Sequence, residues 1–166
     1  MIHLITTFFH IGHMRPAPGT WGSLAGLTTG FLLFVAGGWG FVAMLIPLVF
    51  LLGWWATARE TRGKVDHDPS EIVIDEVVGQ WIALLPVLIG ASHAGFTGTS
   101  ALALWPGWIA AFVLFRLFDI WKPSLIGRAD RRADALGVML DDAIAGVAAG
   151  LCTAAAAGIA HGLLGL

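Results

Sequence analysis

Cysteine and charge are both scarce in this sequence. The single cysteine, Cys152, lies in an apolar run rich in alanine and glycine, so an internal disulfide is impossible and neither a CxxC nor a Cys/His zinc pattern occurs. We interpret Cys152 as a small core residue. A net charge of -2 argues against a nucleic-acid partner.

Charged residues form 12% of the chain, whereas about 25% is usual in soluble proteins. Hydrophobic residues form 57%, and the mean hydropathy is +0.82. A soluble globule of 166 residues has too little interior to bury that much apolar surface. We therefore expect an all-α, polytopic membrane helical bundle that forms a single domain over residues 1–166.

Apolar stretches of span-like length alternate with short polar segments. Residues 1–13 lack the cationic region and cleavage site of a signal peptide, so we expect them to be retained. They are short for a span, and the sequence leaves open whether they cross the membrane or lie on it. Pro47 falls inside an apolar stretch, where we expect a kink and not a stop. About five spans are predicted, near residues 21–35, 41–57, 71–90, 101–117 and 143–164.

The positive charges indicate a topology. All nine Lys and Arg residues fall at Arg15, in 59–76 or in 116–142, and five spans place these segments on one side of the membrane. The opposite connections, 37–40 and 92–100, carry none. The positive-inside rule therefore predicts a charged cytoplasmic face.

Two acidic pairs lie at predicted span mouths on that face. Asp75 and Glu76 follow Glu71, which stacks over Asp75 if the helix begins near residue 71. Gly79, one turn later, leaves a bare patch for a ligand or a neighbouring helix. Asp141 and Asp142 open the last predicted span, where first-turn acids also favour the helix dipole.

Clustered carboxylates repel one another without a cation, and hard oxygen ligands suit Mg²⁺. We expect Mg²⁺ as the cofactor, with a ligand set of Asp75, Glu76, Asp141 and Asp142. Glu71 is a further possible ligand.

Cations and a glycine turn complement the acids. Arg116, Asp119 and Lys122 are spaced by three and share a face if their helix continues to Pro123. The two cations either form a phosphate clamp or extend to the interface and pair with Asp119. The turn containing Gly19 and Thr20 precedes a helix, and backbone N–H groups there can bind an anion.

The six histidines show no metal-ligand spacing such as HExxH, and we interpret most of them as bystanders. Serine-hydrolase elbows and thiol or DxDxT phosphatase motifs are also absent. A phosphatase on this chain would therefore more economically use metal-assisted hydrolysis.

Four blocks together resemble the signatures of the phosphatidylglycerophosphatase A family, in the family's order. They are PAPGTWGS at 16–23, IDEVVG at 74–79, RLFDIWKP at 116–123 and GVMLDD at 137–142. The resemblance implies a magnesium-dependent enzyme of a bacterial-type cytoplasmic (inner) membrane. It would convert phosphatidylglycerophosphate to phosphatidylglycerol in glycerophospholipid synthesis. Asp134-Ala135 replaces a glycine pair that is frequent in the family, which predicts a less flexible stretch.

We predict a lipid phosphatase in which water attacks phosphorus with the help of Mg²⁺. Asp75 or Glu76 orients the water, and Asp119 and Asp142 complete the catalytic set; a covalent route through Asp or Thr20 stays open. The phosphate-binding residues are Gly19, Thr20, Arg116 and Lys122. Two alternatives are an ion- or proton-coupled transporter that uses the same carboxylates and a structural membrane subunit.

Overall fold

The computed structural model describes residues 1–64, 66 and 68–163, with side chains up to residue 160. The prediction for His67, the end of the last span at Leu164 and the side chain of His161 lie outside the described residues. All regular structure in the described part is helical, which confirms the all-α prediction. The elements are α1 (Ile2–Thr6), η1 (Ile11–His13), α2 (Pro18–Glu60), α3 (Ile74–His93), η2 (Gly98–Leu104), α4 (Trp105–Trp121), α5 (Leu125–Asp130) and α6 (Ala135–Leu163).

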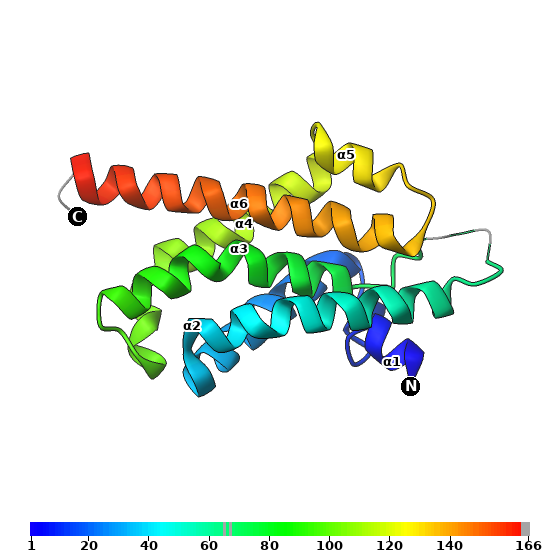
Figure 1. The fold of residues 1–166 in the computed structure, drawn as a ribbon, viewed down its shortest axis with the longest axis horizontal. Coiled ribbons are helices and arrows are strands. Elements are labelled where there is room, and N and C mark those ends of the chain that lie inside the picture. The colour runs from blue at the N-terminus through cyan, green and yellow to red at the C-terminus, as the bar shows by residue number, and fades with distance from the viewer. Residues whose placement is uncertain (65, 67, 164–166) are drawn as a thin grey trace.

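Helix α2 contains a reversal of the chain. Gly38 adopts φ 74° and ψ -178°, a conformation that suits glycine, and α2 turns back on itself there (Figure 1). Pro47 lies inside the returning arm, which continues past it. Four described helical segments are long and apolar enough to cross a membrane, and the two arms of α2 raise the number of passes to the predicted five.

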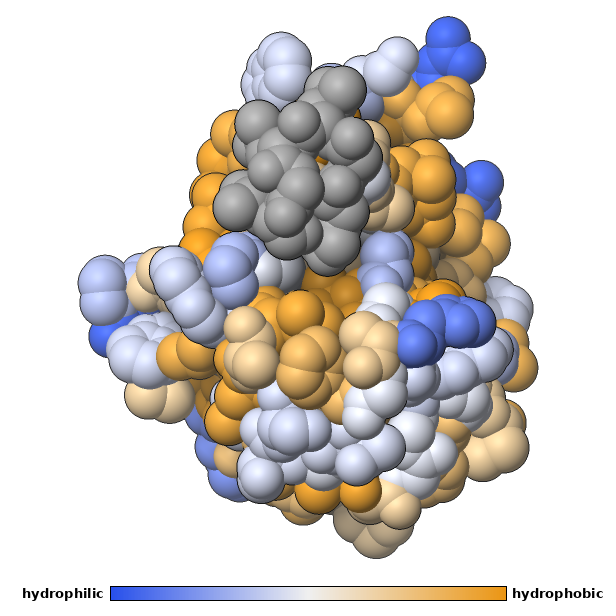
Figure 2. All heavy atoms as spheres, turned by 90° about the vertical axis from the view of Figure 1, so that its left-hand side faces the viewer, coloured by the Kyte–Doolittle hydropathy of each residue, from blue (hydrophilic) through white to orange (hydrophobic). Residues whose placement is uncertain are grey.

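Helix α3 occupies the centre of the bundle. In its apolar window 67% of the residues are buried, against 11% in that of α2. Val77, Leu84 and Leu88 are fully buried and pack against the neighbouring helices. The other long helices turn apolar side chains outward, and Leu151 of α6 is 68% exposed. Figure 2 shows an end of the molecule that is mostly apolar or weakly polar. The outward-facing apolar side chains of the long helices suit a lipid environment.

Glycines allow α2 and α3 to approach closely. A Cβ added to Gly26 would lie 3.1 Å from the Cα of Val77 and 2.9 Å from the Cβ of Gln80. The indole of Trp81 donates hydrogen bonds to the carbonyl of Gly26 at 3.0 Å and to the hydroxyl of Thr29 at 3.1 Å. Small residues at helix contacts serve this role in membrane bundles, where water does not drive association.

Two predicted helix starts are wrong. Helix α3 begins at Ile74, because Val73 has non-helical φ and ψ of -137° and 9° and its N–H donates to the Thr6 carbonyl at 2.9 Å. Glu71 therefore precedes the helix and does not stack over Asp75. Helix α6 begins at Ala135, where the Asp134 carboxylate accepts a hydrogen bond from the Gly137 N–H at 2.8 Å. Asp141 and Asp142 thus lie in the second turn, beyond the first-turn dipole effect that we considered.

The interpretation of Cys152 as a core residue is also wrong. Its side chain is exposed on the outside of α6. Alanine and glycine neighbours indicated close packing, but the buried face of α6 carries Ala145, Ala149 and Thr153 instead. Composition alone cannot choose between two faces of a helix that is apolar all round.

Candidate functional site

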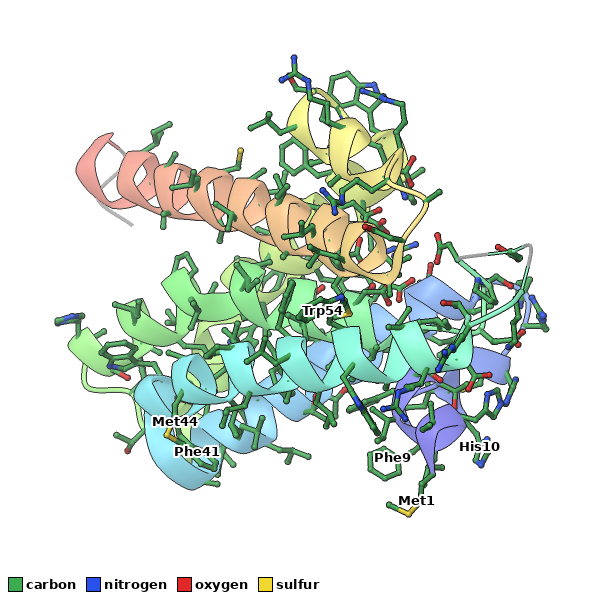
Figure 3. All side chains as sticks on the ribbon, turned by 45° about the vertical axis from the view of Figure 1, so that its right-hand side comes forward. Met1, Phe9, His10, Phe41, Met44 and Trp54 are labelled. Atoms are coloured by element: carbon green, nitrogen blue, oxygen red, sulfur yellow. The ribbon has the colours of Figure 1, made fainter. Side chains whose placement is uncertain are left out.

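A polar cavity of about 340 Å³ opens at the end of the bundle where α2 and α3 begin and α4 ends. Figure 3 shows side-chain oxygen and nitrogen atoms gathered at this end. All four sequence blocks contribute to its wall. The lining residues are Ala17, Pro18, Gly19, Asp68, Ser70, Ile72, Asp75, Glu76, Arg116, Asp119, Ile120, Lys122, Asp141 and Asp142.

Three carboxylates converge inside the cavity. Asp75 and Glu76 of α3 and Asp142 of α6 each offer an oxygen, and these oxygens lie within 4.8 Å of one another. Asp75 is 6% exposed and Asp142 is 3% exposed. The two helices meet closely because Gly146 packs on the backbone of Gly79, so the bare patch at Gly79 holds a neighbouring helix.

The other predicted metal ligands lie differently. Asp141 lines the cavity, but its carboxylate accepts a hydrogen bond from Lys122 at 2.7 Å and is outside the convergent group. Glu71 lies outside the described lining, and its backbone packs against Gly12 of the N-terminal segment. The difference follows from the later start of α3, which leaves Glu71 in the connecting loop.

Arg116 is held in place by two partners. It forms an ion pair with Asp119, one turn along α4, and donates a hydrogen bond to the Ser23 hydroxyl at 3.3 Å. Ser23 is fully buried and donates in turn to the Gly19 carbonyl at 2.8 Å. The Nε atom of Arg116 is buried and has no partner among the described residues, so the guanidinium retains an unused donor.

Lys122 ends helix α4, just before Pro123, in a left-handed conformation with φ 50°. Because the helix continues to this point, the three-residue spacing brings Arg116, Asp119 and Lys122 to the cavity. Its ammonium group pairs with Asp130 and Asp141. Partial burial opposes the charge, but the hydrogen bonds to these two carboxylates outweigh it and raise the pKa of Lys122 above its ordinary value. Lys122 therefore stays cationic in the cavity wall.

Gly19 lies in the first turn of α2 and lines the cavity. A Cβ at this position would overlap the Glu76 carboxylate and lie 3.1 Å from Nη1 of Arg116. Among the described residues no side chain caps the start of α2, so the first N–H groups of the helix are available at the cavity edge. Thr20, in contrast, is exposed and is not part of the described lining.

Several residues that line the cavity or contact its lining escaped the sequence analysis. Ser23, a partner of Arg116, lies four residues after Gly19 and thus on the same helical face. Asp68 and Ser70 belong to a loop, and Asp130 to the short helix α5, where no periodicity predicts which way a side chain points. Helical spacing could have identified Ser23, but only the folded chain brings the loop residues to the cavity.

The charges of the cavity favour a bound dication. Six carboxylates and two cations line it among the described residues. One oxygen of Glu76, Oε2, is buried without a hydrogen-bond partner in the described part of the chain. An orphaned buried carboxylate oxygen beside two further acids matches the hard oxygen donor set of Mg²⁺.

Fold and cavity together define a class: a helical membrane protein with a cavity at one end of its bundle that clustered carboxylates line together with Arg116 and Lys122. The family model for phosphatidylglycerophosphatase A matches residues 4–157. The chain therefore belongs to the phosphatidylglycerophosphatase A family, as its four blocks predict.

Curated relatives cover most of the chain. A phosphatidylglycerophosphatase A of Haemophilus influenzae is 38% identical over 147 residues, which cover 88% of this chain and 82% of the relative. The Escherichia coli protein of that name is 32% identical, with coverages of 87% and 77%. A putative phosphatidylinositol-3-phosphatase of Bacteroides thetaiotaomicron is 38% identical, with coverages of 87% and 86%. No solved structure matches the chain.

Proposed function

We propose that the protein hydrolyses phosphatidylglycerophosphate to phosphatidylglycerol and phosphate. The observation that carries the proposal is the placement of three convergent carboxylates, two of them buried, together with Arg116 and Lys122 in one cavity at the end of apolar helices. The family membership and the names of two relatives support it.

The residues of the cavity divide the work. Asp75, Glu76 and Asp142 would hold Mg²⁺, while Asp141 lines the same cavity and accepts a hydrogen bond from Lys122. Bound Mg²⁺ neutralises phosphate charge and lowers the pKa of water. Glu76 or Asp75 accepts the proton of the attacking water as general base. Asp75 and Asp142 are buried, which limits their contact with bulk water.

The opposite wall binds the phosphate. Arg116 and Lys122 donate to the phosphate oxygens, and Asp119 and Ser23 keep the guanidinium aimed at them. The N–H groups at the start of α2, next to Gly19, add an anion site. Ile72 and Ile120 line the same cavity, so the lipid can present its head group while its acyl chains stay between apolar helices.

A coupled transporter is the weaker interpretation. Transporters commonly place ionisable residues near the middle of their helices, on the path of the ion. Here the acids of α3 and α6 lie in the first two turns, and Asp119 lies in the last turn of α4.

The names of the relatives differ in the lipid head group, because one relative is named a putative phosphatidylinositol-3-phosphatase. The test is phosphate release by the purified protein from phosphatidylglycerophosphate and from phosphatidylinositol 3-phosphate, in mixed micelles with Mg²⁺ or with a chelator. We expect Mg²⁺-dependent release that is faster from phosphatidylglycerophosphate. Release from neither lipid by folded protein would overturn the phosphatase proposal, and faster release from the phosphoinositide would overturn the assigned head group.

A further inference from the structure

Three histidines outside the polar cavity form a second cluster of potential metal ligands. His3 of α1 and His10 and His13 around η1 each offer a ring nitrogen, and these nitrogens lie within 4.8 Å of one another. The Nε2 atoms of His3 and His13 are 3.0 Å apart. The rings of His10 and His13 are stacked, with centroids 5.5 Å apart.

An unusual backbone brings the three rings together. Phe8, Phe9 and His10 are consecutive non-glycine residues with positive φ of 43°, 57° and 68°. Left-handed conformations cost on the order of 1–2 kcal/mol for each such residue. The chain accepts them in a tight reversal, closed by hydrogen bonds from Phe9 N to Leu4 O at 2.8 Å and from Gly12 N to Thr7 O at 3.0 Å. Such strain is typical of sites where a function fixes the backbone.

A carboxylate supports the histidine cluster from behind. Nδ1 of His3 lies 3.3 Å from Oε1 of Glu60, at the end of α2, and Lys64 holds the same oxygen at 3.0 Å. A proton on Nδ1 donated to Glu60 leaves the Nε2 lone pair of His3 facing His13. Histidines that bind metals almost always donate their second nitrogen in this way, which fixes the tautomer and strengthens the ligand.

We propose that His3, His10 and His13 bind one divalent transition-metal ion of the Zn²⁺ class, with Glu60 as the outer hydrogen-bond partner. Three imidazoles favour such ions over Mg²⁺, which prefers oxygen. Tetrahedral zinc with bonds of about 2.0–2.1 Å needs ligand nitrogens roughly 3.4 Å apart. The ring nitrogens here lie within 4.8 Å of one another, so the rings need to move by about an ångström to reach that separation. His10 and His13 are exposed, and Figure 3 shows His10 at the outer edge of the molecule, so an ion and a completing water can enter.

Metal binding at this site would fasten the N-terminal segment to the end of α2. The same segment already contacts the chain that enters α3: Thr6 accepts the hydrogen bond from Val73, and Gly12 packs on Glu71. An ion bound there stabilises the folded state by mass action, and the melting temperature rises with its concentration.

The test is a Co²⁺ titration of detergent-purified protein without a histidine tag, followed by ligand-field absorption. Excess Mg²⁺ is present to occupy the acidic cavity. Variants H10A and H13A remove a ligand, E60Q removes the outer carboxylate, and H93A is the matched control because His93 is exposed and distant in sequence from the cluster. Circular dichroism and metal-free melting temperatures verify that each variant folds.

We expect wild type and H93A to bind one Co²⁺ and to gain melting temperature with it. E60Q should bind about 10–100-fold more weakly, and H10A and H13A more weakly still. No saturable binding by the wild type, or binding by H10A and H13A equal to that of the wild type, would overturn the proposal. Hydrogen bonding between His3 and His13 would then account for the cluster.

Discussion

Asp142 lies almost fully inside the protein beside two further acids, Asp75 and Glu76. Buried carboxylates that lack cations are costly, and no Lys or Arg hydrogen bond is found for these three in the described structure. This arrangement supports the proposal that the three groups share a dication. The electrostatic cost of keeping the three carboxylates together without a cation is the reason to expect function here.

Substitution of either aspartate should abolish turnover without unfolding the chain. D75N and D142N keep the size of the side chain but remove a ligand charge. Because changes to outer partners of a metal already cost about 10–100-fold, we expect a loss of at least that size in phosphate release. Melting temperatures measured without Mg²⁺ should not fall. Wild-type activity in both variants would contradict the assigned site.

Ser23 is a positioning residue for the guanidinium of Arg116. S23A removes the buried hydroxyl, and a hydrogen bond to a charged group is worth about 1.5–3 kcal/mol, so we expect kcat/KM to fall roughly 10–100-fold. The matched control is T28A, since Thr28 makes the same bond to the carbonyl four residues earlier, at 2.9 Å, from an exposed position. Equal activity of S23A and T28A would remove Ser23 from the site. The coupling would be supported if S23A lowers kcat/KM in the wild-type protein but causes no further drop in a protein that already carries R116A.

Residue types predicted the acids and cations of the cavity but not their partners. Asp75, Glu76 and Asp142 lie together as expected from the acidic pairs, whereas Asp141 turns to Lys122. Adjacent residues on a helix point in directions about 100° apart, so Asp141 can face Lys122 while Asp142 faces Asp75 and Glu76. The histidine cluster was missed because irregular backbone, and no helical spacing, joins its members.

Among the elements, α2 and α3 depend on close backbone contact. In G26A the new methyl group meets the backbone of Val77, and overpacking typically costs about 1–3 kcal/mol. G40A is the matched control in the same helix: its added Cβ meets nothing within 4 Å, and alanine favours helix by up to about 1 kcal/mol. We expect thermal unfolding in detergent to occur at lower temperature for G26A than for G40A. The reverse order would show that the contact between α2 and α3 is loose.

The sequence predicted the number of elements better than their ends. Long apolar runs define five passes, and the glycines in residues 37–40 are enough to predict the reversal of α2. The start of α3 could not be predicted in this way, because the hydrogen bond between Val73 and Thr6 joins residues 67 positions apart. The start of α6 depends on Asp134, which caps the helix where glycines are frequent in the family.

At the scale of the whole molecule, the distribution of Lys and Arg predicts that the cavity faces the cytoplasm. The test uses C152A, which removes the exposed native thiol, with a new cysteine at exposed Arg62 or Thr99. In intact cells of a bacterial host, a membrane-impermeant maleimide should label T99C directly and R62C only after permeabilisation. The opposite pattern would invert the topology.

The central claim is that Asp75, Glu76 and Asp142 share one divalent ion. Its most direct test is Mn²⁺ binding, followed by electron paramagnetic resonance, in wild type, D142N and the control E71Q. We predict one Mn²⁺, displaced by Mg²⁺, in wild type and E71Q, and its loss in D142N. Equal binding by all three proteins, or none by the wild type, would contradict the account.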